Sequence, residues 1–438
     1  MSVAAALGDA RRYEDQIDRL HRRYLFTRHL YELQQEEVSL ASVVQQRSRV
    51  AKLLAKTVAR GEYECAPAHI REIRVDGKLR TVFSYRLTDL IVHGVVSELV
   101  DEAMTPLLSQ RLYSYRKGVS WWTPVADFAA YVRAHRRANP NPRTRGLYVL
   151  RRDIEAYTDS IPVHGASPLW PMLREALGEL RDPERELLQR VVRPEVVRLD
   201  GGTVSLVHGV PTGQPISCVL FNLYLHELDR ELAAVPGAFY ARYSDDILFA
   251  HPDASVVQRV DAAIDAHIAG LDLRLSEEKR RTLYLTGAGR ASDVWAEARG
   301  TTVVPFLGTF IALDGRVSLS RKKLRTLLRD LRERALQTAN AVGRADPERA
   351  GRVVCSVLNS ALDRKPGPFQ QRSALLVSRV VTDRRQLAQI DYQLARIVLE
   401  AVTGDRSVRA FRRTPYRKIR ESWGLRSTEH ARNEQAAA

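Results

Sequence analysis

Cysteine is scarce in this chain, which holds three among its 438 residues: Cys65, Cys218 and Cys355. They lie far apart, and no Cys-x-x-Cys pair or Cys/His cluster occurs along the sequence. The spacing therefore indicates neither a structural zinc site nor a disulfide framework. A chain without disulfides suits a reducing compartment, and we expect a cytoplasmic protein.

Long hydrophobic runs are also missing. The sequence contains no run of 18 apolar residues, so we expect no membrane span and no membrane partner. Its first residues, MSVAAALGDARRYEDQ, turn polar too early for a signal peptide. Acidic residues are outnumbered, because 52 Asp and Glu face 68 Lys and Arg, a formal net charge of +16. This excess favours a polyanionic partner, most commonly nucleic acid, over the alternative of a soluble protein that happens to be basic.

The residues that are present are typical of a globular protein, with an apolar fraction of 45%. The length suits two to three domains. Helical periodicity and strand alternation predict a mixture of both element types. We expect helices over 11–60, 87–105, 168–192, 216–228, 254–270 and from about 320 onward, and strands or hairpins over 73–83, 146–154, 196–206, 239–249, 282–285 and 303–319. The helix over 87–105 is expected to be amphipathic, with Asp89 and Glu98 in solvent.

Two adjacent acids, Asp245 and Asp246, lie between the apolar, β-favouring runs of ARYSDDILFA. An acid pair at the tip of a buried hairpin is costly unless something neutralises it. Mg²⁺ or Mn²⁺ would do so, because both prefer hard oxygen ligands. The alternative is a solvated Asp-Asp turn. Asp153, at the end of the predicted strand over 146–154, is a third acid that an open cleft would offer to a metal.

Two further stretches suit phosphate binding. Asp76-Gly77 between alternating apolar residues predicts a hairpin that presents Lys78 and Arg80, two cations able to hold a triphosphate. Their alternative is an ordinary solvated strand face. The loop GVPTGQPIS, residues 209–217, precedes a helix. Its glycines and prolines let the backbone approach a ligand closely, or they mark a helix start with Pro in its first turn.

Aromatic residues interleaved with cations suggest contacts with bases and phosphates in two places. The first is RLYSYRKGVSWW, from which we select Arg116, Lys117 and Trp121; the alternative is a tryptophan-anchored surface loop. The second is FRRTPYRKIR, residues 411–420, with five cations and two aromatics. There we expect RNA phosphates to be bound by Arg412, Arg413, Arg417 and Lys418; the alternative is a solvated helix end.

Taken in order, these stretches resemble the palm of a reverse transcriptase. RRDIEAYTDSI, GVPTGQPISCVLFNLYL, ARYSDDILFA, LRLSEEKRRT and PFLGTFIAL resemble motifs A to E, and RTVFSYRLTDLIVHGVV and RLYSYRKGVSWW resemble the fingers motifs before them. The match covers roughly residues 70–320. The resemblance implies an α+β right-hand polymerase, with N-terminal helices and fingers in 1–145, a palm in 146–300, a primer-grip-like hairpin in 301–320, and a helical thumb with a basic C-terminal region in 321–438.

The resemblance also implies roles for individual residues of an RNA-directed DNA polymerase. Asp153, Asp245 and Asp246 would be catalytic and would hold two Mg²⁺ or Mn²⁺ ions, with the backbone carbonyl of Ile154 as a further ligand. Lys279 would protonate pyrophosphate; its alternative is a solvated charge in the run EEKRR. The nucleotide-binding set implied by the motifs is Lys78, Arg80, Tyr157, Thr158, Thr212, Gly213, Gln214 and Lys279.

Three positions depart from the family pattern. Thr158 stands where an aromatic residue usually guards the sugar, Thr212 where many relatives have Gln, and Ser244 where Ala, Val or Met is common. These departures preserve the metal site and put nucleotide selectivity in question.

The elements SYRKG and FRRTPYRKIRESWGL resemble those of the unknown-group, defence-associated reverse transcriptases, which are related to retron and group II intron enzymes. The Asn-Ala-x-x-His element of retron enzymes is missing from the sequence, although Val402-Thr403-Gly404 matches their Val-Thr-Gly. This resemblance implies antiphage defence with a non-coding RNA template, dNTPs and a DNA product, and it leaves a homo-oligomer open. The alternatives are untemplated or protein-primed DNA synthesis, and a catalytically idle RNA-binding scaffold, against which the three acids argue.

Overall fold

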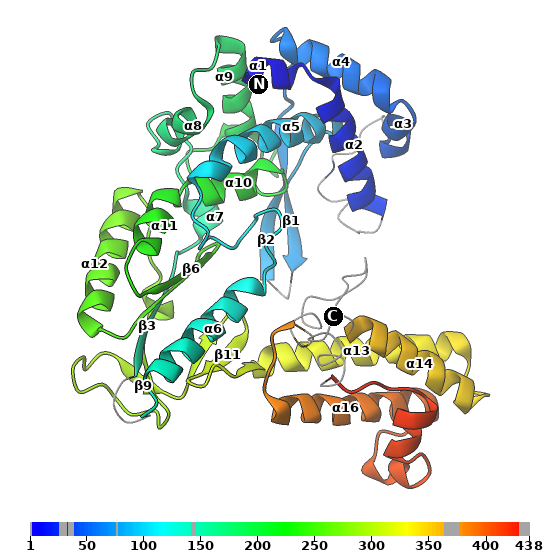
Figure 1. The fold of residues 1–438 in the computed structure, drawn as a ribbon. Helices are drawn as coiled ribbons and strands as arrows, with labels where there is room; N and C mark the ends of the chain where they lie inside the picture. The colour runs from blue at the N-terminus through cyan, green and yellow to red at the C-terminus, as the bar shows by residue number, and fades with distance from the viewer. Residues whose placement is uncertain are drawn as a thin grey trace. The chain divides into compact units, whose positions relative to one another are not determined.

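The computed structural model describes residues 2–25, 33, 39–75, 78–141, 146–362, 377 and 379–428. It confirms a mixed α+β fold (Figure 1). The chain forms two compact units, of which the first contains residues 1–119, 150–249 and 255–281 and the second contains residues 120–149, 250–254 and 282–438. Among the described helices, none combines the length and the apolar composition that crossing a bilayer requires.

Helix α5 (Leu87–Met104) is the centre of the helical part of the first unit. It contacts α1 (Val3–Leu7), α2 (Ala10–Leu25), α8 (Leu169–Leu177), α9 (Asp182–Val192) and α10 (Ile216–Leu223), while α3 (Leu40–Gln45) and α4 (Arg47–Ala59) pack on α2. The prediction that α5 is amphipathic was wrong, because side chains on nearly all of its faces are buried. A helix that is apolar all round belongs inside a protein, and this one is enclosed by its neighbours.

Asp89 on α5 was expected in solvent and is instead 1% exposed. The hydroxyl of Tyr63 and the backbone N–H of Ala66 donate to its two carboxylate oxygens, at 2.7 and 3.2 Å, which offsets the cost of burying the charge. Cys65 and His93 lie beside it, with one ligand-type atom from each of the three residues within 4.8 Å of the others. The sequence spacing of these residues gave no indication of this cluster.

A four-stranded sheet of order β2-β1-β4-β5 also belongs to the first unit. Strands β1 (Ala68–Val75) and β2 (Lys78–Ser84) pair antiparallel with Val75 opposite Lys78, as the predicted hairpin requires. Strands β4 (Glu195–Val197) and β5 (Thr203–Ser205) form the second predicted hairpin. The helix expected over 168–192 is two helices, because Gly178, with φ of 73°, ends α8 and the chain restarts at α9.

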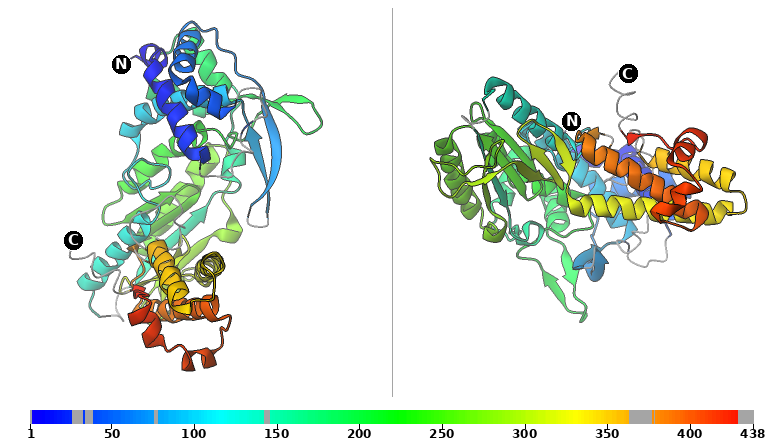
Figure 2. Two further views of the ribbon diagram at one scale, coloured as in Figure 1. Left: turned by 90° about the vertical axis from the view of Figure 1, so that its right-hand side faces the viewer. Right: turned by 90° about the horizontal axis from the view of Figure 1, so that it is seen from below.

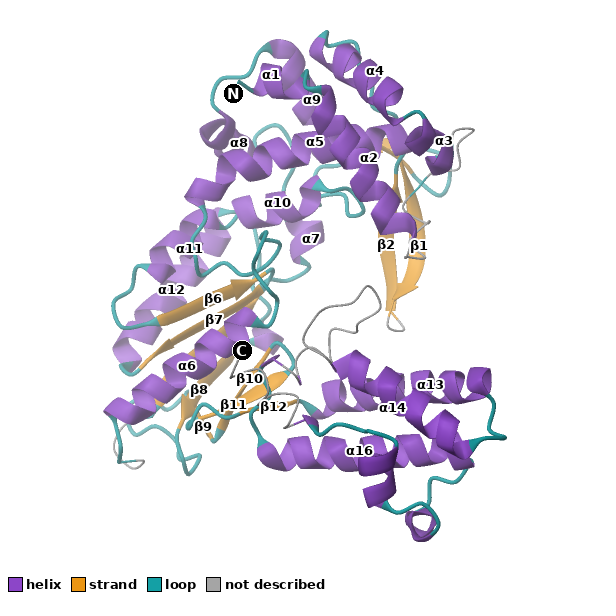
Figure 3. Ribbon diagram, turned by 45° about the vertical axis from the view of Figure 1, so that its right-hand side comes forward, coloured by secondary structure: helices purple, strands orange, loops and turns teal. Residues whose placement is uncertain are grey.

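A five-stranded sheet has the order β6-β7-β3-β8-β9 (Figure 3). Its strands are β3 (Leu147–Asp153), β6 (Phe239–Tyr243), β7 (Asp246–His251), β8 (Arg281–Leu285) and β9 (Arg299–Thr301). Helix α11 (His226–Ala233) packs on β6, and α12 (Ala254–Gly270) follows β7. Strand β3, predicted to end in an acid, is buried over its first four residues and becomes less buried at Asp153.

The second unit contains the antiparallel strands β10 (Val303–Phe306), β11 (Thr309–Ala312) and β12 (Val317–Leu319), with α6 (Thr123–Ala138) against β11. Helices α13 (Arg321–Val342), α14 (Pro347–Leu362) and α16 (Arg384–Thr403) then pack side by side, the yellow-to-orange bundle of Figure 2. The short helices η4 (Val408–Arg412) and η5 (Lys418–Ser422) follow and rest on this bundle. The predicted hairpins and helices of this region are therefore present.

Candidate active site

The turn between β6 and β7 carries the acid pair. Ser244, with φ of 59°, takes the left-handed conformation that non-glycine residues seldom adopt. Its N–H donates to the Ser114 hydroxyl at 2.9 Å, and Ser114 is in turn bonded to Asn222. The carbonyl of Asp245 accepts the N–H of Ile154 at 3.2 Å. That bond joins the turn to the end of β3 and brings Asp153 and Asp245 to one edge of the sheet.

Arg242, which precedes the last residue of β6, is fully buried and fixes this turn. Its Nε and Nη2 donate to the two oxygens of the buried Asp229 at 2.7 and 2.6 Å, and its Nη1 donates to the Ser244 carbonyl at 3.1 Å. Tyr240 adds a hydroxyl donor to Asp229 at 2.6 Å. Burial alone would lower the pKa of Arg242, but the Asp229 carboxylate raises it, so the guanidinium stays charged. An arginine inside a buried apolar strand requires an acidic partner. The position of Arg242 within such a strand is the sequence feature that could have indicated this buried ion pair.

Cations already contact two of the three aspartates. The ammonium of Lys279, in the short helix η3 (Glu277–Lys279), lies 2.5 Å from Oδ1 of Asp153, and this hydrogen bond raises the pKa of Lys279. Arg151 donates to both oxygens of Asp246, at 2.9 and 2.7 Å. The next residue, Arg152, points to the opposite face of β3 and is buried among acids of α12 and η3. Sequence reasoning singled out Lys279 but missed both arginines.

The three carboxylates act on one another. Burial raises the pKa of Asp245, and repulsion from Asp153 and Asp246 raises it further. Burial also raises the pKa of Asp246, although its ion pair with Arg151 favours the charged form; here burial outweighs the pair. Asp153, Asp245 and Asp246 are not among the groups of described residues whose possible ligand atoms all lie within 4.8 Å of one another. The three carboxylates are therefore farther apart than the ligands of such a group. Oxygen donors of like charge at one sheet edge fit a hard divalent cation, which would reduce this repulsion.

The predicted nucleotide-binding residues near β3 occupy two different environments. Ala156, with φ of 45°, turns the chain out of strand geometry into α7 (Tyr157–Ser160). Tyr157 is 2% exposed and its hydroxyl donates to the Phe221 carbonyl at 2.6 Å, so its ring belongs to the core. Thr158 is half-buried, and its carbonyl accepts the Val210 N–H at 2.9 Å. Of these two predicted residues, Thr158 is the accessible one.

The glycine-proline loop is attached to β2. The Thr212 carbonyl accepts the Phe83 N–H at 3.3 Å, and a Cβ at Gly213, whose φ is 104°, would lie 2.6 Å from the Phe83 carbonyl oxygen. Glycine is therefore required at 213. Gln214 is 4% exposed and its amide donates to the Val191 carbonyl, so it faces the interior. The side chains of Lys78 and Arg80 lie outside the described residues.

The predicted nucleic-acid contacts near α6 are engaged within the protein. Arg116 donates to the carbonyls of Ser109 and Leu112, and Lys117 pairs with Asp101 at 3.1 Å. Trp121 belongs to the other compact unit, where its ring meets that of Trp122 edge-on at 5.9 Å. The binding of nucleic acid by these three residues stays a prediction.

Tyr115 belongs to the predicted stretch RLYSYRKGVSWW but was not among the residues selected from it. It has φ of 54° and is 45% exposed, and its ring lies 6.2 Å from that of Phe221, close to the acid turn. A left-handed backbone conformation exposes the Tyr115 ring. Such a conformation is predictable from sequence mainly at glycine, so this position could not be recognised in advance.

The C-terminal set is more exposed. Arg412 and Arg413 are exposed at the end of η4, Arg417 pairs with Glu421 at 2.8 Å, and Lys418 pairs with Glu348. The ring of Phe411 lies 6.0 Å from Tyr392 and 6.4 Å from Tyr416. Phe411 and Tyr416 lie close to the four cations in the sequence, and the predicted binding of RNA phosphates by this segment stays a prediction.

The family of reverse transcriptases, RNA-dependent DNA polymerases, has a model that matches residues 74–311, more than half of the chain. The chain belongs to this family. Over 85 residues it is 34% identical to the retron Mx65 reverse transcriptase of Myxococcus xanthus, a match that covers 19% of this chain and 20% of that one. The prediction of a prokaryotic reverse transcriptase related to retron enzymes is confirmed.

Solved structures of telomerase are also similar. Apo telomerase from Candida tropicalis shares 13% identity at a TM-score of 0.46, over 82% of this chain and 60% of that one. Telomerase from Candida albicans in complex with a fragment of telomeric RNA shares 10% identity at a TM-score of 0.45, over 86% and 67%. The chain spans a fifth of the curated retron relative and about three fifths of the first of these telomerases.

Proposed function

We propose that this protein is an RNA-directed DNA polymerase whose active site lies where β3 meets the β6–β7 turn. The observation that carries the proposal is the Ile154–Asp245 backbone bond, which holds Asp153 and the acid pair at one sheet edge in a member of the reverse transcriptase family. Asp153 and Asp245 would hold two divalent ions, Mg²⁺ first and Mn²⁺ as the substitute, with Asp246 beside them and the carbonyl of Ile154 as a further ligand. When bound, such ions would supply activation of the primer hydroxyl and neutralisation of the departing pyrophosphate.

The remaining residues of the site orient groups and move protons. Lys279 is kept protonated by Asp153, which suits a proton donor to pyrophosphate. Arg151, by holding Asp246, keeps that carboxylate in one orientation. Thr212 and Gly213 offer an accessible stretch of backbone beside β2, where Lys78 and Arg80 would meet a triphosphate. In this proposal β10–β12 form the primer grip and α13, α14 and α16 form the thumb.

Primer extension tests the proposal. The purified protein is given a DNA primer on an RNA template, the same primer on a DNA template, or the primer alone, with Mg²⁺ or Mn²⁺. We expect products whose sequence copies the RNA. Synthesis that continues without template, or product that stays attached to protein until protease is added, would favour untemplated or protein-primed synthesis, and RNA binding without synthesis would favour an idle scaffold.

The biological role that we propose is antiphage defence with a non-coding RNA as template. It is supported by the resemblance of SYRKG and FRRTPYRKIRESWGL to defence-associated enzymes and by the retron relative. Sequencing the nucleic acid that co-purifies with the protein identifies the template. A phage challenge of cells that carry either the wild-type protein or the Asp245→Asn variant then tests the role. Protection by a variant that has lost DNA synthesis would contradict it.

Thr158→Tyr is expected to increase rejection of ribonucleotides. Threonine leaves space beside the sugar where family members place an aromatic ring, and Tyr157 is held in the core and cannot replace that ring. A lost steric clash changes selectivity by about 1–3 kcal/mol, or roughly tenfold to 200-fold. Comparison of dNTP and rNTP incorporation by both proteins measures the effect. If wild type already rejects rNTPs as firmly as the variant, another residue guards the sugar, and the exposed Tyr115 is the next to substitute.

Neutralising Arg412, Arg413, Arg417 and Lys418 together is expected to weaken RNA binding and to flatten its salt dependence. Each lost phosphate contact lowers the slope of log K against log salt by about 0.7–0.9. Filter binding across a salt series measures both quantities. The matched control neutralises four exposed arginines elsewhere: Arg60, Arg198, Arg230 and Arg259. Equal slopes for the two quadruple variants would mean that the C-terminal cations point away from the RNA.

A further inference from the structure

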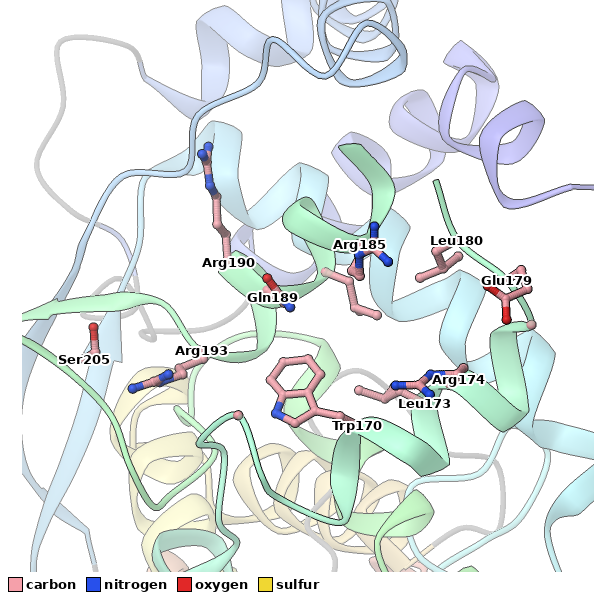
Figure 4. A pocket seen from close by; sticks show the side chains of 13 residues that line it. Trp170, Leu173, Arg174, Glu179, Leu180, Arg185, Gln189, Arg190, Arg193 and Ser205 are labelled. Atoms are coloured by element: carbon pink, nitrogen blue, oxygen red, sulfur yellow. The ribbon is translucent and has the colours of Figure 1, made fainter. Parts of the chain in front are cut away.

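A cavity of about 430 Å³ opens between α8, α9 and β5 in the first unit (Figure 4). Its size falls in the range of small-ligand sites, roughly 300–1,000 Å³. The described residues that line it come from 165–205, so none of them belongs to β3, β7 or the turn between β6 and β7, which carry the aspartates. The proposed polymerase site therefore leaves this cavity without a role.

The cavity wall is cationic. Four of its side chains are arginines, Arg174, Arg185, Arg190 and Arg193, against one acid, Glu179. Arg185 pairs with Asp182 and Arg190 with Glu186, each within α9 and in solvent. Exposed pairs of this kind are weak, so a phosphate can replace the carboxylate at little cost. The Nε of Arg193 donates to the Leu206 carbonyl at 2.7 Å, and this hydrogen bond orients the guanidinium. The two Nη groups of Arg193 can then donate to a ligand.

One aromatic ring stands among these cations. Figure 4 shows Trp170 between Arg193 on one side and Arg174 on the other. The indole N–H donates to the His164 carbonyl at 2.8 Å, which satisfies its one donor and fixes the ring. Buried Leu173 and Leu188 supply apolar wall beside it. An immobilised indole with arginines on both sides offers a π-face for a base and donors for the phosphates that flank it.

We propose that this cavity binds an unpaired nucleotide of an RNA strand, with its base against Trp170 and the adjacent phosphates at Arg174 and Arg185. The inference rests on the proposed function in one respect, the presence of an RNA partner. It adds a contact that lies outside the elements carrying the aspartates. The cavity is open to solvent along exposed arginines, which suits a strand that enters and leaves rather than a small molecule that is enclosed.

Charge reversal with a matched control tests the proposal. The double variant Arg174→Glu with Arg185→Glu is compared with Arg198→Glu plus Arg230→Glu, which changes net charge equally at exposed arginines that do not line the cavity. The probe is a single-stranded RNA 15-mer of mixed sequence with 4-thiouridine. We expect the cavity variant to bind at least tenfold more weakly, with the salt slope reduced by about 1.4 for two lost contacts on a single strand. The control keeps most of its affinity.

Two further measurements locate the contact. Ultraviolet cross-linking of the 4-thiouridine probe should mark the peptide around Trp170, and Trp170→Ala should lose that mark while Trp170→Phe, which keeps a ring, retains most of it. Thermal unfolding midpoints close to that of wild type exclude a loss of fold. Cross-links confined to other peptides, or equal binding by the two double variants, overturn the proposal. So does displacement of the RNA by millimolar dATP, since that result assigns the cavity to free nucleotides.

Failure of this inference is distinguishable from failure of the proposed polymerase. The rate of extension of oligo(dT) on poly(rA) depends on the aspartates, so at saturating poly(rA) the cavity variants should extend at the wild-type rate and differ only in a weaker apparent affinity for the template. A wild-type protein that extends the primer but shows no cross-link at 165–205 loses the cavity site and keeps the polymerase. A protein that cross-links there and extends nothing keeps the cavity site and loses the polymerase.

Discussion

Asp245→Asn should lower the rate of nucleotide addition by on the order of a thousandfold or more. A metal ion at a phosphoryl centre stabilises the transition state by several kcal/mol, and each 1.36 kcal/mol is a factor of ten. Asparagine has the same shape as aspartate and lacks the charge, so the turn and its Ile154 bond should remain. Single-turnover primer extension at several Mg²⁺ concentrations measures the effect, and higher Mg²⁺ should recover little of it.

The control for this substitution is Asp200→Asn in the exposed β4–β5 turn, where the side chain accepts a backbone N–H that asparagine also satisfies. It should be indistinguishable from wild type. The unfolding midpoint of Asp245→Asn should not fall, because burial and repulsion already raise the pKa of this aspartate and make its charge unfavourable in the folded protein. Full polymerase activity in Asp245→Asn would remove the turn from the active site.

Arg242→Leu should produce the largest loss of stability of any single change considered. It leaves Asp229 buried with a charge and without its guanidinium partner, and breaking a buried ion pair in this way costs about 3–5 kcal/mol. It also removes the donor to the Ser244 carbonyl, so the acid turn loses its orientation as well. Urea denaturation measures the first effect, and kcat at saturating dNTP measures the second.

The double variant Arg242→Leu with Asp229→Leu separates these two effects. With both charges gone the desolvation penalty disappears, and stability should recover in part. Activity should not recover, since no donor then holds the Ser244 carbonyl. Arg417→Leu, which breaks an exposed pair with Glu421, is the reference and should change stability little. Recovery of kcat together with stability would show that Arg242 supports the fold and does not position the turn.

Local pattern was sufficient to predict much of this fold. Alternation and Asp-Gly turns located the hairpins over 73–83 and 303–319, and the run before Asp153 located a central strand. Helix α5 shows where this reasoning ends. Its sequence was interpreted as amphipathic, with Asp89 and Glu98 in solvent, yet Tyr63 and Ala66, distant in the sequence, satisfy Asp89 inside the protein. Burial of a helix by elements distant in the sequence depends on tertiary structure, so a local sequence pattern cannot predict it.

The candidate site divides in the same way. Charged residues of the motifs could be predicted individually, because each motif is contiguous in the sequence. The partners of those charges could not, since Arg151 meets Asp246 and Lys279 meets Asp153 only after β3, β7 and η3 are assembled. Gln214 shows the opposite case: it belongs to the loop 209–217, for which the sequence predicted nucleotide binding, but its side-chain amide donates to the Val191 carbonyl.

The contact of Gly213 with Phe83 limits how this enzyme can evolve. Any side chain at 213 would collide with the β2 backbone, so we expect substitutions there to destabilise the fold whatever substrate the enzyme uses. Thr212 is half-buried and meets β2 through its carbonyl, which every amino acid possesses, so this contact does not depend on its side chain. We therefore expect substitutions that change substrate preference to be tolerated at 212 and not at 213. A laboratory library that randomises 212 and keeps Gly213 would explore nucleotide selectivity, and most of its variants should still fold.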